Sequence, residues 1–487
     1  TRSATPLPTS CVSKAARGTC SRHGGVHACG AVVRKRVPSK SFTVQGGGTD
    51  RVMTKSTRLS SATGLDPVDV ASEQLAAVGR SQLTLSAVAE AANMRSPALI
   101  KRHGRLDDLL DMADLQRFEL AGRVLWRDAL PDLVSAASKD AVAAWLDARV
   151  VDVFEPATVE ARRARSAALA DTHGRSNLQV RLTQHFQRER DAFEDALVVL
   201  QERGVRPGGD LRKASLLFLI VLHMPVFLDV HPRLTTPAAC AVAQRYRRVL
   251  YRTVLAVDPP DDVVMPSGTL GMDDIAAPDL PTLTPFGETV VHAAIELLDE
   301  DGYPAIKIGP LTEKLGVNVA RIYRDVGDVA TIDRYAQARR LIGAAIADIE
   351  TMRERPTPTS RDELRTLLHD VLDAGLGASR VPNRQRRLSA LGASFGRSDL
   401  VALAAAHHVE ATHEAMTLTQ PWWEALQLPT HRVATSLWSM GIPIGLAHVD
   451  SIAGGYRDAL ASFFVDEMYT DLVHPPPGPS RPATLED

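Results

Sequence analysis

From residue 66 onward, apolar residues recur every three or four positions, which is the spacing of an amphipathic helix. The segment 286–302 is an example, because Val290, Ala294 and Leu298 fall on one helical face. Strand signals are scarce, since alternating β-branched runs are short and isolated. The pattern therefore predicts an all-α protein.

The helical pattern occurs twice along the chain. A shift of 223 positions overlays residues 66–110 on residues 289–333 without a gap. The overlay matches Gly79 with Gly302, Gly104 with Gly327, and Leu99 with Ile322. Self-similarity at a fixed period indicates repeated structural units. We therefore expect two related halves of roughly 190 residues each.

Composition marks the limits of these halves. Residues 1–60 carry eleven Lys or Arg and one acidic residue, and an acidic stretch with several prolines begins at residue 258. We predict a disordered tail at the first place and a linker at the second. The expected segments are a basic tail (1–60), a first head (61–112), a first helical body (113–257), the linker (258–284), a second head (285–333), a second body (334–473) and a Pro-rich disordered tail (474–487).

The basic tail has two interpretations. Residues 1–52 either form an arm that contacts DNA phosphates without sequence preference, or they come from an over-long gene prediction. The second interpretation arises because Met53 lies just before the helical pattern. Both stay open at the level of the sequence.

Charge and cysteine content narrow the classes of function. The net charge is −2, and the chain after residue 60 has 45 basic and 57 acidic residues, so a DNA-binding surface must be a local patch. Cys11, Cys20 and Cys29 lie in the tail at spacings wider than a structural zinc motif has, and we predict no metal and no cofactor. No apolar run reaches the ~18–20 residues of a membrane span, and no signal peptide is recognisable, so we expect a cytoplasmic protein.

Each half contains a pattern typical of a helix-turn-helix unit. In the second half we expect a helix over 309–316 with Pro310 at its first position, a turn at Gly316, and a helix over 319–325 capped by Asn318. Val319 and Ile322 are expected on the inward face of the latter helix. In such units the second helix enters the major groove of DNA, where cations contact phosphates and polar side chains contact bases. The candidate DNA-binding residues are Arg95, Ser96, Pro97, Lys101, Arg102, His103 and Arg105 in the first half, and Asn318, Arg321, Tyr323 and Arg324 in the second.

Two segments resemble the DNA-binding signature of the TetR/AcrR family of transcriptional regulators. They are AVAEAANMRSPALIKRHGRLDDLL (87–110) and IELLDEDGYPAIKIGPLTEKLGVNVARIYRDVGDVATI (295–332). The resemblance covers about 45 residues of each half. It implies two tandem TetR-like units, each with a three-helix helix-turn-helix head and a helical body for ligand binding and dimerisation.

Both heads depart from the family pattern, which has Tyr, then His-Phe, and then a turn followed by Lys. The second head keeps Tyr323 but has Asp325 and Val326 in place of His-Phe, and its Lys position holds Asp328 or Val329. The first head has Ile100 in place of the Tyr, whereas Arg105 can substitute for the Lys. We therefore expect the first head to be the more basic of the two.

The resemblance implies a one-component regulator, with a double-stranded DNA operator and an unknown small-molecule effector as partners. We expect a repressor whose two bodies pack as an intramolecular pseudo-dimer, and further homodimerisation stays open. The alternative is a helical ligand-binding or protein-interaction module with degenerate heads. We predict no enzyme, because no nucleophile elbow, P-loop or H-E-x-x-H motif occurs.

Two further groups of residues have open interpretations. Trp422, Trp423 and Trp438 either line a ligand pocket or pack in a core. His407, His408, His413, Glu410 and Glu414 have helical spacings that a metal site could use, but such spacings recur by chance.

Overall fold

The fold is known from a computed structural model that describes most of the chain after residue 64. The described residues are 65–80, 83–170, 172, 175–231, 233–261, 280, 282–301, 306–395, 397–428, 432–452 and 457–474. The predicted basic tail, most of the predicted linker and almost all of the predicted Pro-rich tail lie outside them. Within the described residues every regular element is a helix, which confirms the all-α class.

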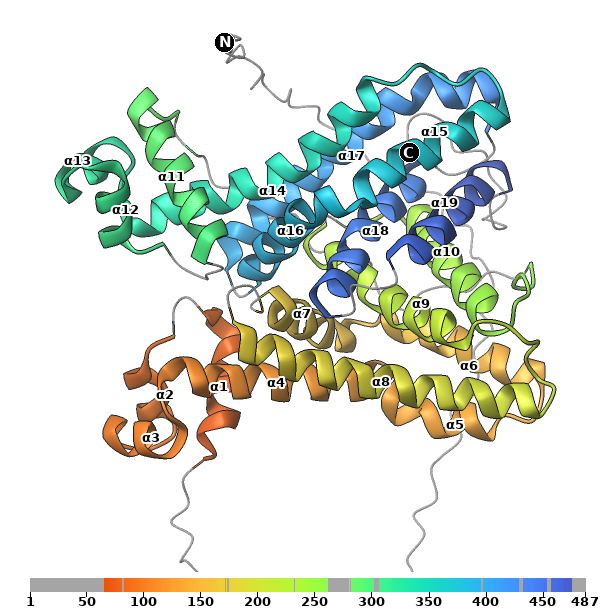
Figure 1. The fold of residues 1–487 in the computed structure, drawn as a ribbon, viewed down its shortest axis with the longest axis horizontal. Helices are drawn as coiled ribbons and strands as arrows, with labels where there is room; N and C mark the ends of the chain where they lie inside the picture. Colours follow the sequence, from red (N-terminus) through yellow and green to blue (C-terminus); the bar gives the residue numbers. More distant parts are fainter. Residues whose placement is uncertain are drawn as a thin grey trace, which may run out of the picture. The chain divides into compact units, whose positions relative to one another are not determined.

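The first half consists of ten α-helices and two short 3-10 helices within the described residues (Figure 1). The α-helices are α1 (Pro67–Val78), α2 (Leu85–Ala91), α3 (Ser96–His103), α4 (Leu106–Leu125), α5 (Leu130–Ser135), α6 (Lys139–Val153), α7 (Pro156–Ala170), α8 (Ser176–Glu202), α9 (Leu211–His223) and α10 (Thr236–Val254). The 3-10 helices are η2 (Arg127–Ala129) and η3 (Met224–Val230), and η3 directly continues α9.

The second half repeats this order of elements. Its helices are α11 (Pro285–Asp301), α12 (Ile308–Leu315), α13 (Val319–Asp325), α14 (Val329–Arg353), α15 (Arg361–Leu376), η4 (Ala378–Arg380), α16 (Val381–Ser394), α17 (Ser398–Leu426), α18 (Arg432–Ile452) and α19 (Arg457–Val473). Apart from α5 and the short 3-10 helices η2 and η4, each element has a counterpart: α1–α4 correspond to α11–α14, α6–α8 to α15–α17, α9 with η3 to α18, and α10 to α19. The repeat seen in the sequence therefore extends to the order of the helices.

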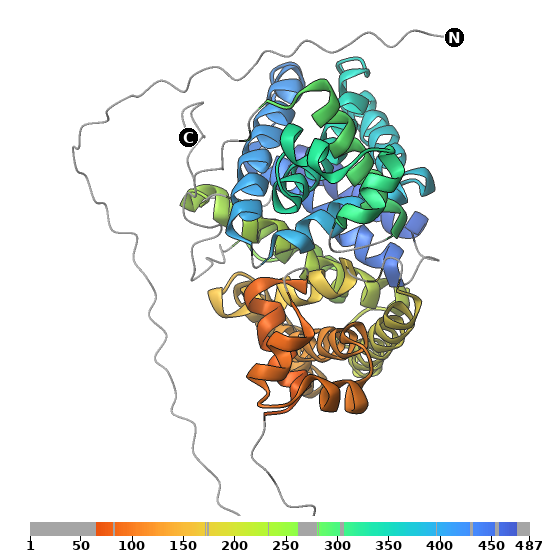
Figure 2. The same cartoon turned by 90° about the vertical axis from the view of Figure 1, so that its left-hand side faces the viewer.

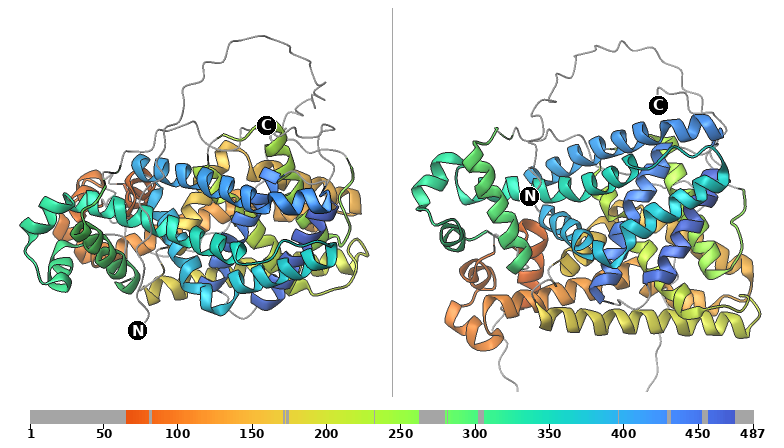
Figure 3. Two further views of the ribbon diagram at one scale, coloured as in Figure 1. Left: turned by 90° about the horizontal axis from the view of Figure 1, so that it is seen from above. Right: turned by 45° about the horizontal axis from the view of Figure 1, so that its top comes forward.

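Each half begins with a small three-helix group that has a core of its own. In the first group, residues such as Leu75, Val88 and Leu99 are buried together. In the second group, Leu298 and Leu311 lie in an equivalent cluster. We call the two groups head 1 (α1–α3) and head 2 (α11–α13). Both heads lie at the same end of the helical part of the protein (Figures 2 and 3).

Two long helices connect the heads to the rest of the protein. The first turns of α4 contribute Leu109 and Leu110 to the core of head 1, whereas Phe118 and Leu125 of the same helix lie in the large central core. In the second half α14 does the same, since its early residues pack in head 2 and Leu341 lies in the central core. Because an α-helix is stiff over this length, a rotation of α4 or α14 in the body also moves the attached head.

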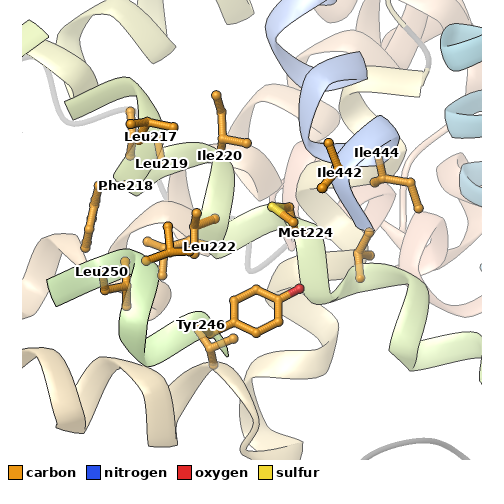
Figure 4. Packing of buried hydrophobic residues seen from close by; sticks show 14 of the residues in the cluster. Leu217, Phe218, Leu219, Ile220, Leu222, Met224, Tyr246, Leu250, Ile442 and Ile444 are labelled. Carbon is orange, nitrogen blue, oxygen red and sulfur yellow. The ribbon is translucent and has the colours of Figure 1, made fainter. Parts of the chain in front are cut away.

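The two halves share the central core. Helix α7 packs against its own counterpart α16, α9 packs against its counterpart α18, and α10 contacts α18 while α19 contacts α9. Such reciprocal contacts are those of a two-fold, isologous interface. Figure 4 shows the centre of this contact, where α18, with the buried residues Ile442 and Ile444, lies beside Met224 of η3.

Close approach at the contact requires a small residue. A Cβ atom added to Gly445 of α18 would lie 2.6 Å from Cγ2 of Ile220 and 2.8 Å from Cγ of Met224. Polar contacts also cross between the halves: Arg245 donates to Oγ1 of Thr435 at 2.9 Å, and Arg252 forms an ion pair with Glu467 at 2.9 Å. The halves are therefore held by packing and by specific polar pairs.

One helical segment among the described residues, Leu211–Val230, is long and apolar enough to cross a membrane by length and composition. Its most apolar window is 94% buried inside the protein. It spans α9 and η3 and lies in the core at the contact between the halves.

Candidate nucleic-acid interface

In each head two short helices are joined by a tight turn, α2 and α3 in head 1 and α12 and α13 in head 2. Asn318 caps α13, because its side chain accepts a hydrogen bond from the backbone N–H of Arg321 at 2.9 Å, as the sequence predicted. Gly316 has a φ of 64° in the preceding turn, and Asn93 has a φ of 52° in the matching turn of head 1. Asn tolerates this left-handed conformation better than most residues other than Gly. The replacement of the turn glycine in head 1 is therefore compatible with the same turn.

Two predicted details of head 2 are wrong. Helix α12 begins at Ile308, so Pro310 is its third residue and not its first; proline is tolerated there because N–H groups of the first turn have no helical partner. Val319 was expected on the inward face, yet it is 36% exposed. Only Ile322, which is fully buried, anchors α13, as the matching Leu99 anchors α3.

Head 1 presents four cations along and beside α3. Arg95, Lys101, Arg102 and Arg105 are all exposed, and none of them forms a side-chain ion pair with the carboxylates that the structure describes. His103 adds no charge at neutral pH, because burial and then the nearby Arg102 lower its pKa. Ser96 and Pro97 begin the helix, with Pro97 exposed. The structure therefore brings the candidate residues of head 1 together on one small surface.

Head 2 presents its cations differently. Arg321 is exposed, and its guanidinium carbon lies 4.1 Å from the ring centroid of Phe286 in α11. Arg324 lies 3.5 Å from the carboxylate of the adjacent Asp325. Tyr323 is 42% exposed, so it is not buried between head and body.

The matched positions of the two heads differ in charge. Arg105 of head 1 corresponds to Asp328 of head 2, and Arg102 corresponds to Asp325. Asp328 has a structural role, because it caps α14 by accepting hydrogen bonds from the backbone N–H and the hydroxyl of Thr331 at 2.8 and 2.7 Å. These hydrogen bonds hold the pKa of Asp328 below its usual value, so it is anionic at neutral pH.

Sequence reasoning missed a pair of ionic contacts between the bodies and the connecting helices. In the first half Arg175, which precedes α8, forms an ion pair with Asp111 of α4 at 2.7 Å. In the second half the matching Arg397, which precedes α17, pairs with Asp333 of α14. Both pairs are related by a shift of 222 positions. The repeat was the only sequence signal that could have identified them.

The other candidate groups are placed in the second body. Trp422 is buried in the central core and Trp423 packs against it, whereas the side chain of Trp438 lies outside the described residues. His407 and His408 are buried, but His413 and Glu410 are exposed. Among the described residues no group of three or more His, Cys, Asp or Glu side chains is arranged to hold a metal ion.

No protein-family model matches the chain, and no curated protein matches it.

Proposed function

We propose that the protein is a DNA-binding transcriptional regulator of TetR-like design, most simply a repressor. The observation that carries the proposal is the pair of exposed short helices, α3 and α13. Each follows a turn with a positive φ and is anchored by one buried residue in a small head core. A helix presented in this way is suited to the major groove of DNA.

The contacts between the halves support a pseudo-dimer within one chain. A two-fold arrangement of DNA-binding heads normally needs two subunits. Here the reciprocal packing of α7, α9 and α10 with α16, α18 and α19 supplies the equivalent interface. Because α4 and α14 belong both to the heads and to the central core, a small molecule bound in a body would change the position of the heads. The existence of such an effector follows from the resemblance alone and stays a prediction.

A salt titration of DNA binding tests the proposal. A regulator that contacts phosphates loses affinity steeply with salt. The logarithm of its association constant falls with the logarithm of the salt concentration, with a slope of about 0.9 per neutralised phosphate. We expect such a slope for the full chain, and we expect a variant with Arg95, Lys101, Arg102 and Arg105 all replaced by Ala to lose most of it. Absence of duplex binding at low salt would contradict the proposal.

A second candidate function is a helical interaction module whose heads no longer bind DNA. It is favoured by the acidic residues of head 2, because Asp325 sits beside Arg324 and Asp328 replaces a cation. This candidate predicts that neither head contributes to a salt-dependent interaction with duplex DNA. The same titration therefore distinguishes the two functions.

A further inference from the structure

Arg321 is the polar residue of head 2 whose geometry the proposed function does not yet explain. Its guanidinium lies 4.1 Å from the centroid of the Phe286 ring, and the residue is nevertheless exposed. No ion pair of Arg321 occurs among the described residues. Its charge is therefore held by an aromatic ring rather than by a carboxylate.

Stacking on a ring fixes the plane of a guanidinium without consuming its hydrogen-bond donors. An Arg side chain interacts with an aromatic face through its own flat face, and the N–H groups at its edge stay available. The geometry also reduces the loss of side-chain freedom when two parallel hydrogen bonds form. Arg321 is thus prepared for a flat partner that has two adjacent acceptors.

The major groove offers one base edge of this kind. Guanine presents O6 and N7 side by side, and a bidentate contact from Arg is the commonest specific pairing in protein–DNA complexes. Two exposed neighbours of Arg321 at the start of α13, Val319 and Ala320, have short side chains, which permit close approach to the groove. Asp325 and Asp328, by contrast, oppose phosphates at the other end of the helix.

Head 1 has a different set of side chains at the matching positions. Arg321 corresponds to Ala98, which cannot form a bidentate contact, whereas head 1 has the larger number of unpaired cations. The proposed function assigns DNA to both heads, and resting on it, we propose that Arg321, positioned by Phe286, reads a guanine in the half-site bound by head 2. Head 1 then supplies most of the contacts to the DNA backbone.

The first experiment is selection of duplexes from a randomised library by the full chain. We expect a guanine to be enriched in one half-site with the wild-type protein. The variant Arg321→Lys keeps the charge but loses the rigid two-donor fork. It should therefore weaken the guanine preference, since Lys contacts guanine without that fixed geometry, and keep the salt slope. Arg365→Lys is the matched control, because Arg365 is an exposed arginine of the second body that also lies over an aromatic ring, that of Tyr469. It should leave the guanine preference unchanged.

The second experiment replaces that guanine with 7-deazaguanine, which lacks the N7 acceptor. The wild-type affinity should fall by roughly 2- to 12-fold, which is half, in free energy, of the 5- to 150-fold range expected for a complete bidentate pair, because O6 remains as an acceptor. The affinity of Arg321→Lys should fall less for the same replacement. Phe286→Leu should reduce the discrimination because the ring is lost, and Phe286→Tyr should restore it; circular dichroism verifies that both variants are folded.

The outcomes separate the inference from the function on which it rests. Salt-dependent binding with no enriched guanine, or a guanine preference that Arg321→Lys retains in full, overturns the inference and leaves the DNA-binding function in place. A uniform loss across all sequences in Arg321→Ala, with a salt slope lower by about one, would identify Arg321 as a phosphate contact instead. Absence of duplex binding by the wild-type chain overturns both.

Discussion

Individual residues decide how alike the two heads are. Leu99 and Ile322 are matched and both are buried, so the same anchoring contact forms twice. Arg105 and Asp328 are matched as well, as the N-cap residues of α4 and α14, but one is an exposed cation and the other is an anion. These matched buried positions thus hold apolar residues in both heads, whereas the matched exposed positions hold residues of different charge. This difference leads us to expect unequal contributions of the heads to DNA binding.

Lys101 is the best single residue with which to test the phosphate contacts of head 1. It is exposed in the last turn of α3 and corresponds to Arg324 in head 2. We expect Lys101→Ala to weaken binding at every sequence and to reduce the salt slope by about one. Lys139, an exposed residue at the start of α6, provides the control, since Lys139→Ala should leave both quantities unchanged. Fluorescence anisotropy at several salt concentrations measures the effect, and equal slopes for the two variants would contradict it.

A substitution at Gly122 of α4 tests how much the buried ion pair of the first body contributes to stability. Arg165 and Glu189 form a bidentate pair at 2.9 and 2.6 Å, and both side chains are fully buried. Burial opposes ionisation of Glu189, but the Arg165 charge prevails and lowers its pKa to about 2. A Cβ atom on Gly122 would collide with Oε1 of Glu189 and lie 2.6 Å from Nη1 of Arg165.

We therefore expect Gly122→Ala to reduce the free energy of unfolding by about 3 kcal/mol or more, because separating a buried ion pair leaves its charges uncompensated. Gly309→Ala is the matched control. Nothing lies within 4 Å of the Cβ position at Gly309, and the site is helical. This control should be neutral or stabilising by about 0.5–1 kcal/mol. Urea unfolding measures both, and similar midpoints for both variants would refute the collision.

Elements were predictable where local signals were strong. The bounds of α13 matched the prediction because Asn318 is a sequence-visible cap, and α11 differs from the predicted 286–302 by one residue at each end. The start of α12 was wrong by one residue, since Pro310 fits several positions of a first turn. The stacking of Arg321 on Phe286 could not be predicted, because these residues are far apart in sequence and only the packing of α11 against α13 brings them together.

The contact of α7, α9 and α18 should make stability sensitive to acid. The rings of His223 and His448 stack at a centroid distance of 4.9 Å, and Nε2 of His448 lies 3.3 Å from Oγ of Ser166. Burial, and to a smaller extent the charge of Arg165, lower the pKa of His448 to about 4. The hydrogen bond with the carbonyl of Ile444 acts in the opposite direction. Burial also lowers the pKa of His223.

The direction of the acid effect follows from the two pKa values of His448. The unfolded chain binds a proton near pH 6.5, whereas the folded protein binds it only near pH 4, so stability falls as the pH decreases through this interval. At pH 5 this one residue should cost about 2 kcal/mol relative to pH 7.5. In His448→Gln the loss between the two pH values should be smaller by that amount. The exposed His413→Gln is the control, and a loss in His448→Gln as large as that of the wild type would show that another group is responsible.

At the scale of the whole molecule, the two halves form one body that carries two different heads. The heads have separate cores, but α4 and α14 tie both of them to a core shared by the halves. A dimer of identical subunits must present two identical heads. A single chain with two halves is free to differ between them, and head 1 and head 2 do differ in charge. The expected operator is therefore asymmetric, and scrambling its two half-sites one at a time should give unequal losses of affinity.

One chain should occupy one operator. The helices α7, α9 and α10 are already covered by α16, α18 and α19, so the surface through which a second subunit would dimerise in the corresponding two-fold arrangement is filled. Two heads also suffice for two half-sites one helical turn apart, about 34 Å. Titration of a selected duplex at concentrations far above the dissociation constant should break at one chain per duplex, and mass photometry should give the mass of a single chain on DNA. A break at two chains per duplex would mean that the shared core does not replace a dimer interface, since each half-site would then need a separate polypeptide.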